Sequence, residues 1–379
     1  MTNHLLPISH FETRLPDQLD LLRSLVEIES PTTEKAAVDS LGEFVAESMR
    51  RRGAVVRQFT QAASGDHWLG QWGEGSGGIL LMAHLDTVHA LGTLARMPWR
   101  VNGKRLHGPG ILDMKSGVAI ALTAIEGLQG AAWTPASRVS LLCTSDEETG
   151  SHSSRELIEQ LAREHSLVLC LEPGLADGSL KTWRKGIGDF RVEVTGKAAH
   201  AGANPEAGVN AIVEMAHVIR QIAALEDPAK GTSVSIGVIG GGTRSNVIPA
   251  ICFAEIDVRV LDESEMSRLD AAMAGLTPTL PKARISFEGG WNRPPMPRTA
   301  MMAETFARAR AVAARIGLQL TEGGTGGGSD ANFVAPLGVP VLDGLGAVGS
   351  GAHSEREYIE LDSLPTRTAL LAAMIGEWG

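Results

Sequence analysis

The sequence predicts an α/β fold in which a mixed, mostly parallel sheet carries helices on both faces and is interrupted by a smaller inserted α+β domain. Two observations lead to this prediction. Short apolar runs alternate with segments of helical spacing up to residue 176, as in parallel strands joined by crossover helices. From residue 177 longer alternating strands appear, and the first pattern resumes at residue 289. We therefore expect a first domain of residues 1–176 and 289–379 and an inserted domain of residues 177–288.

The first domain opens with two helices, expected over residues 16–29 and from a cap at Thr32 or Thr33 to residue 52. Asn102-Gly103 marks a hairpin turn, and a glycine-rich bend over residues 108–117 leads into a helix. The other expected elements are strands at 54–59, 68–72, 79–84, 139–144, 167–171 and 339–342, and helices at 116–127, 154–164 and 300–316.

The inserted domain is predicted to be a split β-α-β unit, which is a ferredoxin-like arrangement. Residues 291–295 are expected to form the return linker. The expected elements are a strand or hairpin at 181–195, a helix at 208–225, strands at 233–239 and 251–260, a helix at 264–274 and a strand at 283–287.

The composition is that of an ordinary globular protein, with 43% hydrophobic and 21% charged residues in 379. A formal charge of −10 without a basic stripe argues against nucleic acid as a partner. No run approaches the roughly 20 apolar residues of a membrane span, and no signal-peptide pattern opens the chain, so a cytoplasmic location is expected. Cys143, Cys170 and Cys252 lie in apolar runs without CxxC spacing, which predicts buried thiols.

One apolar strand ends in chemistry-bearing residues. The run over residues 79–86 closes with His84-Leu85-Asp86, and His84 falls at the carboxyl end, where open α/β sheets place their ligands. In an extended segment His84 and Asp86 point to the same side. Asp86 can therefore steady the His84 ring or whatever that ring binds.

Further polar residues follow neighbouring strands. Together with His84 they supply two imidazoles and three carboxylates, the ligand mix of a two-zinc hydrolytic site. The other four are Asp113, Glu148, Glu172 and His353. Asp113 lies between the others in a glycine bend and is the best candidate to be shared by two ions. Glu147, adjacent to Glu148 in an acidic loop, is the candidate general base.

Each of these residues has a simpler alternative. Adjacent glutamates are usually a solvated loop, Asp113 can cap the helix at Ser116, and His353 can be an exposed loop histidine. The glycine loop at 323–328 lacks the Lys-Ser/Thr ending of a phosphate-binding loop, which disfavours nucleotide binding.

The chain resembles the zinc exopeptidase family that includes glutamate carboxypeptidases, aminoacylases, acetylornithine deacetylases and succinyl-diaminopimelate desuccinylases. The similarity covers nearly the whole chain in the order of the family's motifs. The matching segments are residues 82–88, 108–117, 145–150, 171–173, 196–202, 245–249, 257–259, 326–331 and 351–354.

The resemblance implies two zinc ions per chain, with cobalt or manganese as substitutes. It places His84, Asp113 and Glu172 around one ion and Asp113, Glu148 and His353 around the other. It also implies that the inserted domain is a lid and a homodimerisation surface.

Further roles follow from the same resemblance. Glu147 would be the base and Asp86 the partner of His84. His200 matches a lid histidine that stabilises the oxyanion, often across the dimer interface, and Asn246 and Arg259 match lid positions associated with substrate binding.

The expected reaction is hydrolysis of the amide of an N-acyl or peptidyl amino acid with a free carboxylate. Arg293 or Arg259 would clamp that carboxylate, because a guanidinium matches it in a two-pronged way. Gly108-Pro109-Gly110 and Glu172 look most like bacterial glutamate carboxypeptidases. An N-acyl-amino-acid deacylase of the acetylornithine or desuccinyl type, or a non-catalytic binder of amino-acid-like ligands, is the alternative.

Overall fold

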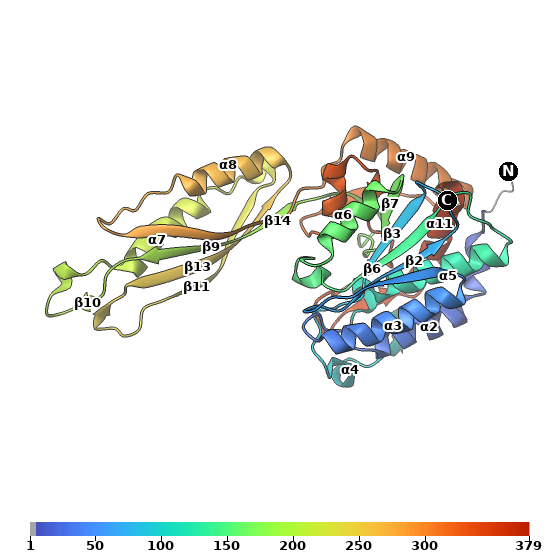
Figure 1. Ribbon diagram of the computed structural model, residues 1–379, viewed down its shortest axis with the longest axis horizontal. Coiled ribbons are helices and arrows are strands. Elements are labelled where there is room, and N and C mark those ends of the chain that lie inside the picture. The colour runs from blue at the N-terminus through green and yellow to red at the C-terminus, as the bar shows by residue number, and fades with distance from the viewer. Residues whose placement is uncertain (1–4, 379) are drawn as a thin grey trace. The chain divides into compact units, whose positions relative to one another are not determined.

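The computed structural model describes residues 5–378 and divides the chain into two compact units. The first unit contains the chain up to Trp183, Arg298–Thr325 and the chain from Ser329 onward. The second contains Arg184–Pro297 and Gly326–Gly328. Each unit has its own sheet, and Figure 1 labels the elements of both.

The second unit begins and ends later than the boundaries at 177 and 288 that the sequence predicted. The strand expected over 181–195 is divided into β8 (Leu180–Arg184), which pairs with β15 (Glu322–Thr325), and β9 (Gly186–Thr195). β14 (Arg284–Arg293) runs through residues expected to form a linker. Alternation of polarity marks a strand but not the sheet that it joins, because its partners are distant in the sequence.

The first unit is organised around a six-stranded sheet with the order β1-β2-β6-β3-β7-β16. The strands β6, β3, β7 and β16 are parallel, whereas β1 and β2 are antiparallel to their neighbours, so the predicted mixed, mostly parallel sheet is confirmed. The strands are β1 (Val55–Phe59), β2 (His67–Trp72), β3 (Ile79–His84), β6 (Val139–Thr144), β7 (Leu167–Cys170) and β16 (Val341–Leu342). All residues of β3, β6 and β7 are buried, which requires cover on both faces of the sheet.

Helices flank this sheet (Figure 1). They are α1 (Ile8–Glu12), α2 (Leu15–Glu27), α3 (Lys35–Arg51), α4 (Thr93–Arg96), α5 (Ser116–Gly130), α6 (Arg155–Arg163), α9 (Ala300–Arg315), α10 (Ala331–Val334) and α11 (Ser363–Trp378). The predicted cap of α3 is wrong: Glu34 occupies the N-cap without a side-chain cap bond, and the Thr32 hydroxyl donates to the Asp86 carboxylate at 2.8 Å. Within residues 5–378, no helix has the length and apolar character needed to cross a membrane.

A small antiparallel sheet with the order β17-β18-β5-β4 brings two distant loops together. The hairpin of β4 (Arg100–Asn102) and β5 (Arg105–His107) turns at Gly103, which has a φ of 59°, as the Asn-Gly pair predicted. β17 (Gly349–Ser350) and β18 (Tyr358–Glu360) enclose the loop of His353, and β18 pairs with β5. The His353 loop is thereby fixed beside the glycine-rich bend that follows β5.

The second unit packs α7 (Ala211–Ala223) and α8 (Glu263–Ala274) on an antiparallel sheet with the order β11-β13-β9-β14 (Figure 1). The other strands are β11 (Ser233–Gly241), β13 (Ile251–Val260) and the short pair β10 (Ala199–His200) and β12 (Val247–Ile248). Both helices begin at a side-chain cap, from Asn210 and Asp262. The order β9-α7-β11-β13-α8-β14 is that of a split β-α-β unit. A role as lid or dimerisation surface stays a prediction.

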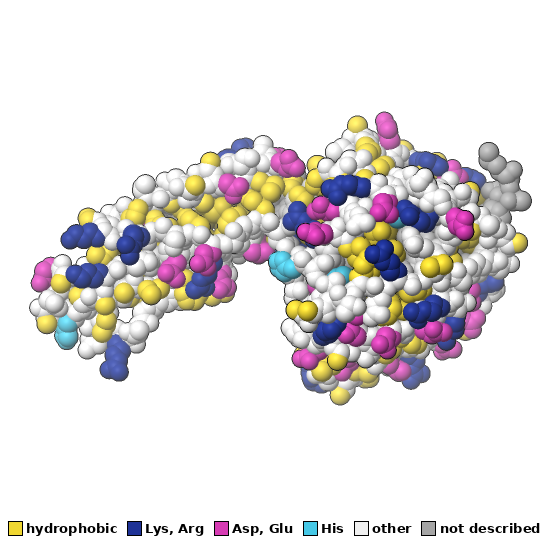
Figure 2. Space-filling view, viewed as in Figure 1, with side chains coloured by type: hydrophobic (Ala, Val, Ile, Leu, Met, Phe, Trp, Pro, Cys, Tyr) yellow, Lys and Arg dark blue, Asp and Glu magenta, His cyan; other side chains and the backbone are white. Residues whose placement is uncertain are grey.

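Charge is mixed on the face drawn in Figure 2, where basic and acidic side chains are interspersed on both units. The formal net charge of −10 is therefore not concentrated on this face as a patch of one sign.

Candidate metal centre

Three of the predicted residues, His84, Glu148 and Glu172, lie at or just after the carboxyl ends of neighbouring parallel strands, at one edge of the large sheet. β3 lies between β6 and β7, and it ends at His84. The turn η2 (Glu147–Thr149) follows β6, and Glu172 follows β7. Asp113 comes from η1 (Ile111–Lys115), a distorted turn between the glycine bend and α5. The carboxyl ends of the strands thus form the floor of the candidate site.

The five predicted ligand residues form two groups that share Asp113, and within each group the candidate ligand atoms lie within 4.8 Å of one another. In the first group, His84 Nε2 lies 3.1 Å from Asp113 Oδ1 and 3.5 Å from Glu172 Oε1. In the second, His353 Nε2 lies 3.3 Å from Asp113 Oδ2 and 3.1 Å from Glu148 Oε2. The two oxygens of Asp113 therefore face different imidazoles, as a shared ligand requires.

The electrostatics of both groups favour bound positive charge. Burial lowers the pKa of His84, but hydrogen bonds to Asp113, Asp86 and Glu172 and the charge of Glu147 raise it well above its usual value. Hydrogen bonds to Asp113 and Glu148 raise the pKa of His353 to about 10. The carboxylates around both imidazoles therefore favour a positive charge at this position, either a proton on the ring or a metal ion. A metal ion and a proton compete for the same nitrogen lone pairs.

The donor atoms fit a metal such as zinc. Each group offers one imidazole nitrogen and two carboxylates, a ligand set that Zn²⁺ accepts and that leaves a position open for water or substrate. The Oε1 atom of Glu148 is buried and has no hydrogen-bond partner within residues 5–378. A buried carboxylate oxygen without a donor is costly, and a cation would relieve that cost.

Asp86 holds the acidic turn as well as His84. The His84 Nδ1 atom lies 2.9 Å from the backbone carbonyl of Asp86 and 3.5 Å from its carboxylate. The carboxylate accepts the backbone N–H groups of Glu147 at 3.3 Å and Glu148 at 3.1 Å. Although burial raises the pKa of Asp86, its hydrogen bonds with His84 and Thr32 and the nearby charge of His84 bring the pKa below the usual value. The predicted partner of His84 thus orients the turn that carries the candidate base.

His200 and Asn246 lie together in the second unit. His200 in β10 pairs with Val247 in β12, and the backbone carbonyl of Asn246 accepts the N–H of Ala201 at 3.0 Å. The Nδ1 atom of His200 accepts the N–H groups of Gly202 and Ala203 at 3.1 and 3.0 Å. An accepting Nδ1 leaves the proton on Nε2, so this exposed ring presents an N–H donor.

Arg259 and Arg293 lie in the four-stranded sheet of the second unit, at the end where β9 begins. Both residues pair with Ile187, one from β13 and one from β14. The Arg259 guanidinium is already engaged by Asp257, with Nε–Oδ1 at 2.8 Å and Nη2–Oδ2 at 2.7 Å. Arg293 is buried, with 3% exposure. A carboxylate ligand that bound the Nε and Nη2 atoms of Arg259 would have to displace Asp257.

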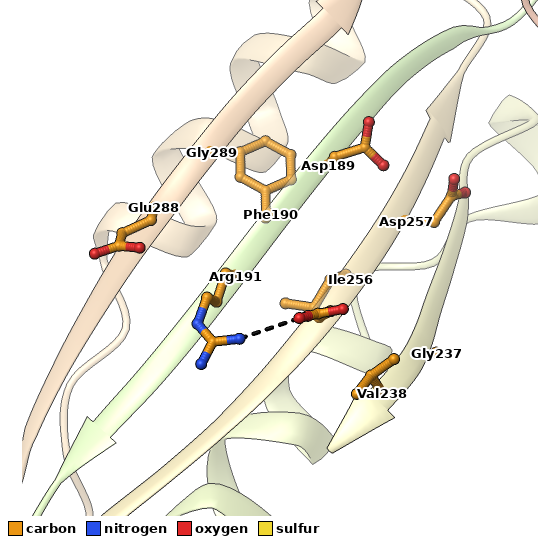
Figure 3. Close-up of a pocket in the computed structure, with 10 residues that line it drawn as sticks. Asp189, Phe190, Arg191, Gly237, Val238, Ile256, Asp257, Glu288 and Gly289 are labelled. Carbon is orange, nitrogen blue, oxygen red and sulfur yellow. Dashed lines mark hydrogen bonds and ion pairs between the residues drawn. The ribbon is translucent and has the colours of Figure 1, made fainter. Parts of the chain in front are cut away.

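The second unit also has a cavity of about 470 Å³, beside the irregular step of β11 near Gly237 (Figure 3). Asp189, Asp257 and Glu288 line it, and its Arg191 is paired with Glu255 at 3.1 Å. An acidic lining disfavours an anionic substrate. None of these carboxylates belongs to a candidate metal group of the described chain. All five residues of the two candidate groups lie in the first unit.

Several residues that shape the site were not predicted. The carboxylate of Glu357, which follows His353 closely in the sequence, accepts the backbone N–H of Asp113 at 2.9 Å. His89 contacts the same carboxylate, and the Sδ atom of Met114 accepts the N–H of His84. The only sequence signal for Glu357 was its position in an acidic segment after His353, which is also typical of a solvated loop.

Known proteins are similar to this chain in sequence or in fold. A carboxypeptidase G2 from Pseudomonas sp. (strain RS-16) is 34% identical over 375 residues, covering 96% of this chain and 90% of that protein. A succinyl-diaminopimelate desuccinylase from Dechloromonas aromatica (strain RCB) is 30% identical over 281 residues, covering 70% and 73%. The crystal structure of the aminopeptidase PepT from Bacillus cereus has a TM-score of 0.79 at 22% identity, covering 96% of this chain and 98% of that one. Residues 80–377 match the sequence profile of Peptidase family M20/M25/M40, and the chain therefore belongs to this family of metallopeptidases and related amidohydrolases.

Proposed function

We propose that this protein is a two-zinc hydrolase that cleaves the amide bond of an N-acyl or peptidyl amino acid with a free carboxylate, with glutamate as the preferred leaving amino acid. The observation that carries the proposal is the pair of ligand groups that share Asp113. The similarity to a carboxypeptidase G2 along 96% of the chain supports the choice of reaction.

In the proposed reaction, each residue of the centre has its own role. When bound, zinc would supply the positive charge that polarises the scissile carbonyl and makes water acidic enough to lose a proton. Glu147 takes a proton from the attacking water and returns it to the leaving nitrogen. Asp86 keeps Glu147 in place through the backbone of the acidic turn. His200 donates its Nε2–H to the developing oxyanion.

A deacylase is the second candidate, because the desuccinylase similarity also spans most of this chain, at 30% identity over 70% of it. The two candidates share the centre and differ in the acyl group and in the amino acid that is released. The leaving amino acid is therefore the property to measure.

A release assay on zinc-loaded protein tests the proposal. The panel contains N-acyl and peptidyl derivatives of glutamate, ornithine, diaminopimelate and neutral amino acids. We expect glutamate to be released fastest, with the activity lost after chelation and restored by Zn²⁺. Preference for ornithine or diaminopimelate would favour the deacylase. Binding of the panel without release of any product would favour a non-catalytic binding protein.

We also propose a homodimer formed through the second unit. His200 lies beyond the end of β9, whereas Arg259 and Arg293 lie opposite Ile187 near its start. From Ile187 to Thr195 the strand extends roughly 26 Å, which is too far for one small substrate to span. A second copy that supplies His200 would remove this separation.

The surface of the second unit is compatible with such a dimer. The edge strand β11 exposes Val238 and Ile239 by 47% and 57%, and α7 exposes Ile212 and Val213 by 43% and 45%. Apolar side chains on an open strand edge favour pairing with another chain. Sedimentation should show a dimer for the wild-type protein and a monomer for Ile239→Lys. A wild-type monomer with full activity would contradict the proposal.

A further inference from the structure

A buried carboxylate beside the candidate site belongs to Glu357, whose side chain is fully buried at 0% exposure. Its Oε1 atom accepts the N–H groups of Leu112 at 2.7 Å and Asp113 at 2.9 Å. Its Oε2 atom accepts the N–H of Gly110 at 3.0 Å and lies 2.8 Å from the Nε2 atom of His89. Four donors therefore converge on one carboxylate that belongs to neither candidate ligand group.

These contacts fix the backbone of the shared ligand. Gly110, Leu112 and Asp113 belong to the bend and to η1, where Asp113, with φ and ψ of −116° and 91°, and the next residue, Met114, both depart from helical backbone angles. The direction of the Asp113 side chain depends on that backbone conformation. Its two oxygens must each face a different imidazole, so a small rotation would misplace both groups.

Glu357 is also tied to His353 through the main chain. Ser354 N donates to Gly351 O and Glu357 N donates to Ser354 O, each at 3.1 Å, which closes a compact loop around His353. His353 itself has a φ of 61°, a left-handed conformation that non-glycine residues adopt only where surrounding contacts enforce it. A single side chain thus links the loop of one imidazole to the backbone of the shared carboxylate.

The third link runs to the loop after β3. His89 lies three positions after Asp86. Its side chain is 10% exposed to solvent and contacts the Glu357 carboxylate. Glu357 therefore joins three segments. The first carries His84 and Asp86, the second carries Asp113, and the third carries His353. These segments are remote in the sequence, with 247 positions between Gly110 and Glu357.

We propose that Glu357 is a positioning residue that sets the spacing of Asp113 and His353 and thereby the affinity of the Asp113–Glu148–His353 group for its metal ion. The inference rests on the proposed two-metal centre. A role in stability alone is the competing explanation, because a buried carboxylate that accepts backbone N–H groups also holds a fold together.

The second unit supplies a matched control. Glu214 is also 0% exposed, and its carboxylate accepts the N–H groups of Thr279 at 2.8 Å and Leu280 at 2.6 Å. Glu214 lies in the other unit and belongs to neither candidate ligand group. Glu357→Gln and Glu214→Gln each replace one buried accepting oxygen by a donor of the same size.

The test compares Zn²⁺ affinity by competition with a chelator and the visible spectrum of the Co²⁺-loaded protein. We expect Glu357→Gln to bind the weaker of two Zn²⁺ ions about 10- to 100-fold less tightly, to show an altered Co²⁺ spectrum and to regain part of its hydrolysis rate in excess Zn²⁺. Glu214→Gln should melt at a lower temperature and keep the wild-type affinity and spectrum.

Wild-type Zn²⁺ affinity and Co²⁺ spectrum in Glu357→Gln would overturn the inference while leaving the proposed function intact. Failure of the wild-type chain to bind Zn²⁺ would instead overturn the proposed function. If Glu357→Gln does not fold, His89→Ala removes only one of the four donors. His89→Ala should weaken Zn²⁺ binding in the same direction by a smaller factor, and unchanged binding would count against Glu357.

Discussion

Both units bury carboxylates, but the carboxylates of the candidate metal centre have different partners from the buried carboxylates of the second unit. In the second unit, Glu265 is 2% exposed and accepts hydrogen bonds from Arg268 at 2.6 Å, Lys230 at 2.9 Å and Thr232 at 2.7 Å. Glu214 is satisfied by two backbone N–H groups. These charges are compensated entirely within the protein, as structural carboxylates must be.

In the first unit, the carboxylates of Asp113 and Glu148 are paired differently. Within residues 5–378 neither Asp113 nor Glu148 forms an ion pair with a lysine or an arginine, and both face imidazoles instead. An imidazole can exchange its proton for a metal ion, whereas an arginine cannot. A binding centre therefore differs from a structural ion pair in the chemical nature of the group beside the carboxylate, and not in how deeply the carboxylate is buried.

The largest effect is expected at the shared ligand. Asp113→Asn keeps the side-chain volume but removes the charge that both groups use, so both metal ions should be lost. The loss of several kcal/mol of electrostatic stabilisation should slow hydrolysis by roughly 10⁴-fold. Elemental analysis and the release assay check this. If Asp113→Asn still bound two ions, the claim that both ligand groups depend on the charge of Asp113 would be wrong.

The next effect separates catalysis from metal binding. Glu147→Gln should retain both metal ions, because Glu147 belongs to neither ligand group. Its hydrolysis rate should fall by about 10²- to 10⁴-fold through loss of the base. The measurement is the rate at saturating substrate together with the metal content of the same sample. A wild-type rate would show that another group takes the proton.

A stability effect without a metal effect is expected in the second unit. Hydrogen bonding to Arg268, outweighing desolvation and helped by Lys230 and Thr232, lowers the pKa of Glu265 from 4.5 to about 2. A lowered pKa in the folded state stabilises the protein above the unfolded pKa, and the benefit disappears as the pH falls from about 4.5 to about 2.

Glu265→Gln should therefore lower the free energy of unfolding by about 1–3 kcal/mol at pH 7. The difference from the wild-type protein should shrink below pH 4.5 in urea unfolding experiments. Zinc content should not change. A loss that is independent of pH would mean that packing, rather than charge, is the contribution of Glu265.

The smallest effect is expected for an exposed ion pair. Arg23 and Glu27 are 2.8 Å apart on α2, with side chains 57% and 43% exposed. Arg23→Ala should leave the free energy of unfolding almost unchanged, because water screens such pairs. Thermal unfolding of both proteins measures this difference. A clearly lower melting temperature for Arg23→Ala would mean that this ion pair stabilises the protein even at the surface.

The sequence predicted the strand ends well because they are local features. Continuous apolar runs mark β3, β6 and β7 in the sequence. Because the carboxyl ends of parallel strands meet at one edge of the sheet, His84, Glu148 and Glu172 converge there. The cap at Thr32 was wrong because the competing acceptor, the Asp86 carboxylate, lies 54 positions away. Glu357 was missed for the same reason, since its partners are still more remote and no periodic pattern marks a buried acceptor in a loop.

The most direct test of the two-metal centre is the number of ions that the protein binds. Metal-free wild-type protein is titrated with Zn²⁺, and bound metal and hydrolysis are measured at each step. We predict saturation at two ions per chain, with hydrolysis rising as the two groups that share Asp113 are filled. Saturation at one ion with full hydrolysis, or no stoichiometric binding at all, would contradict the account.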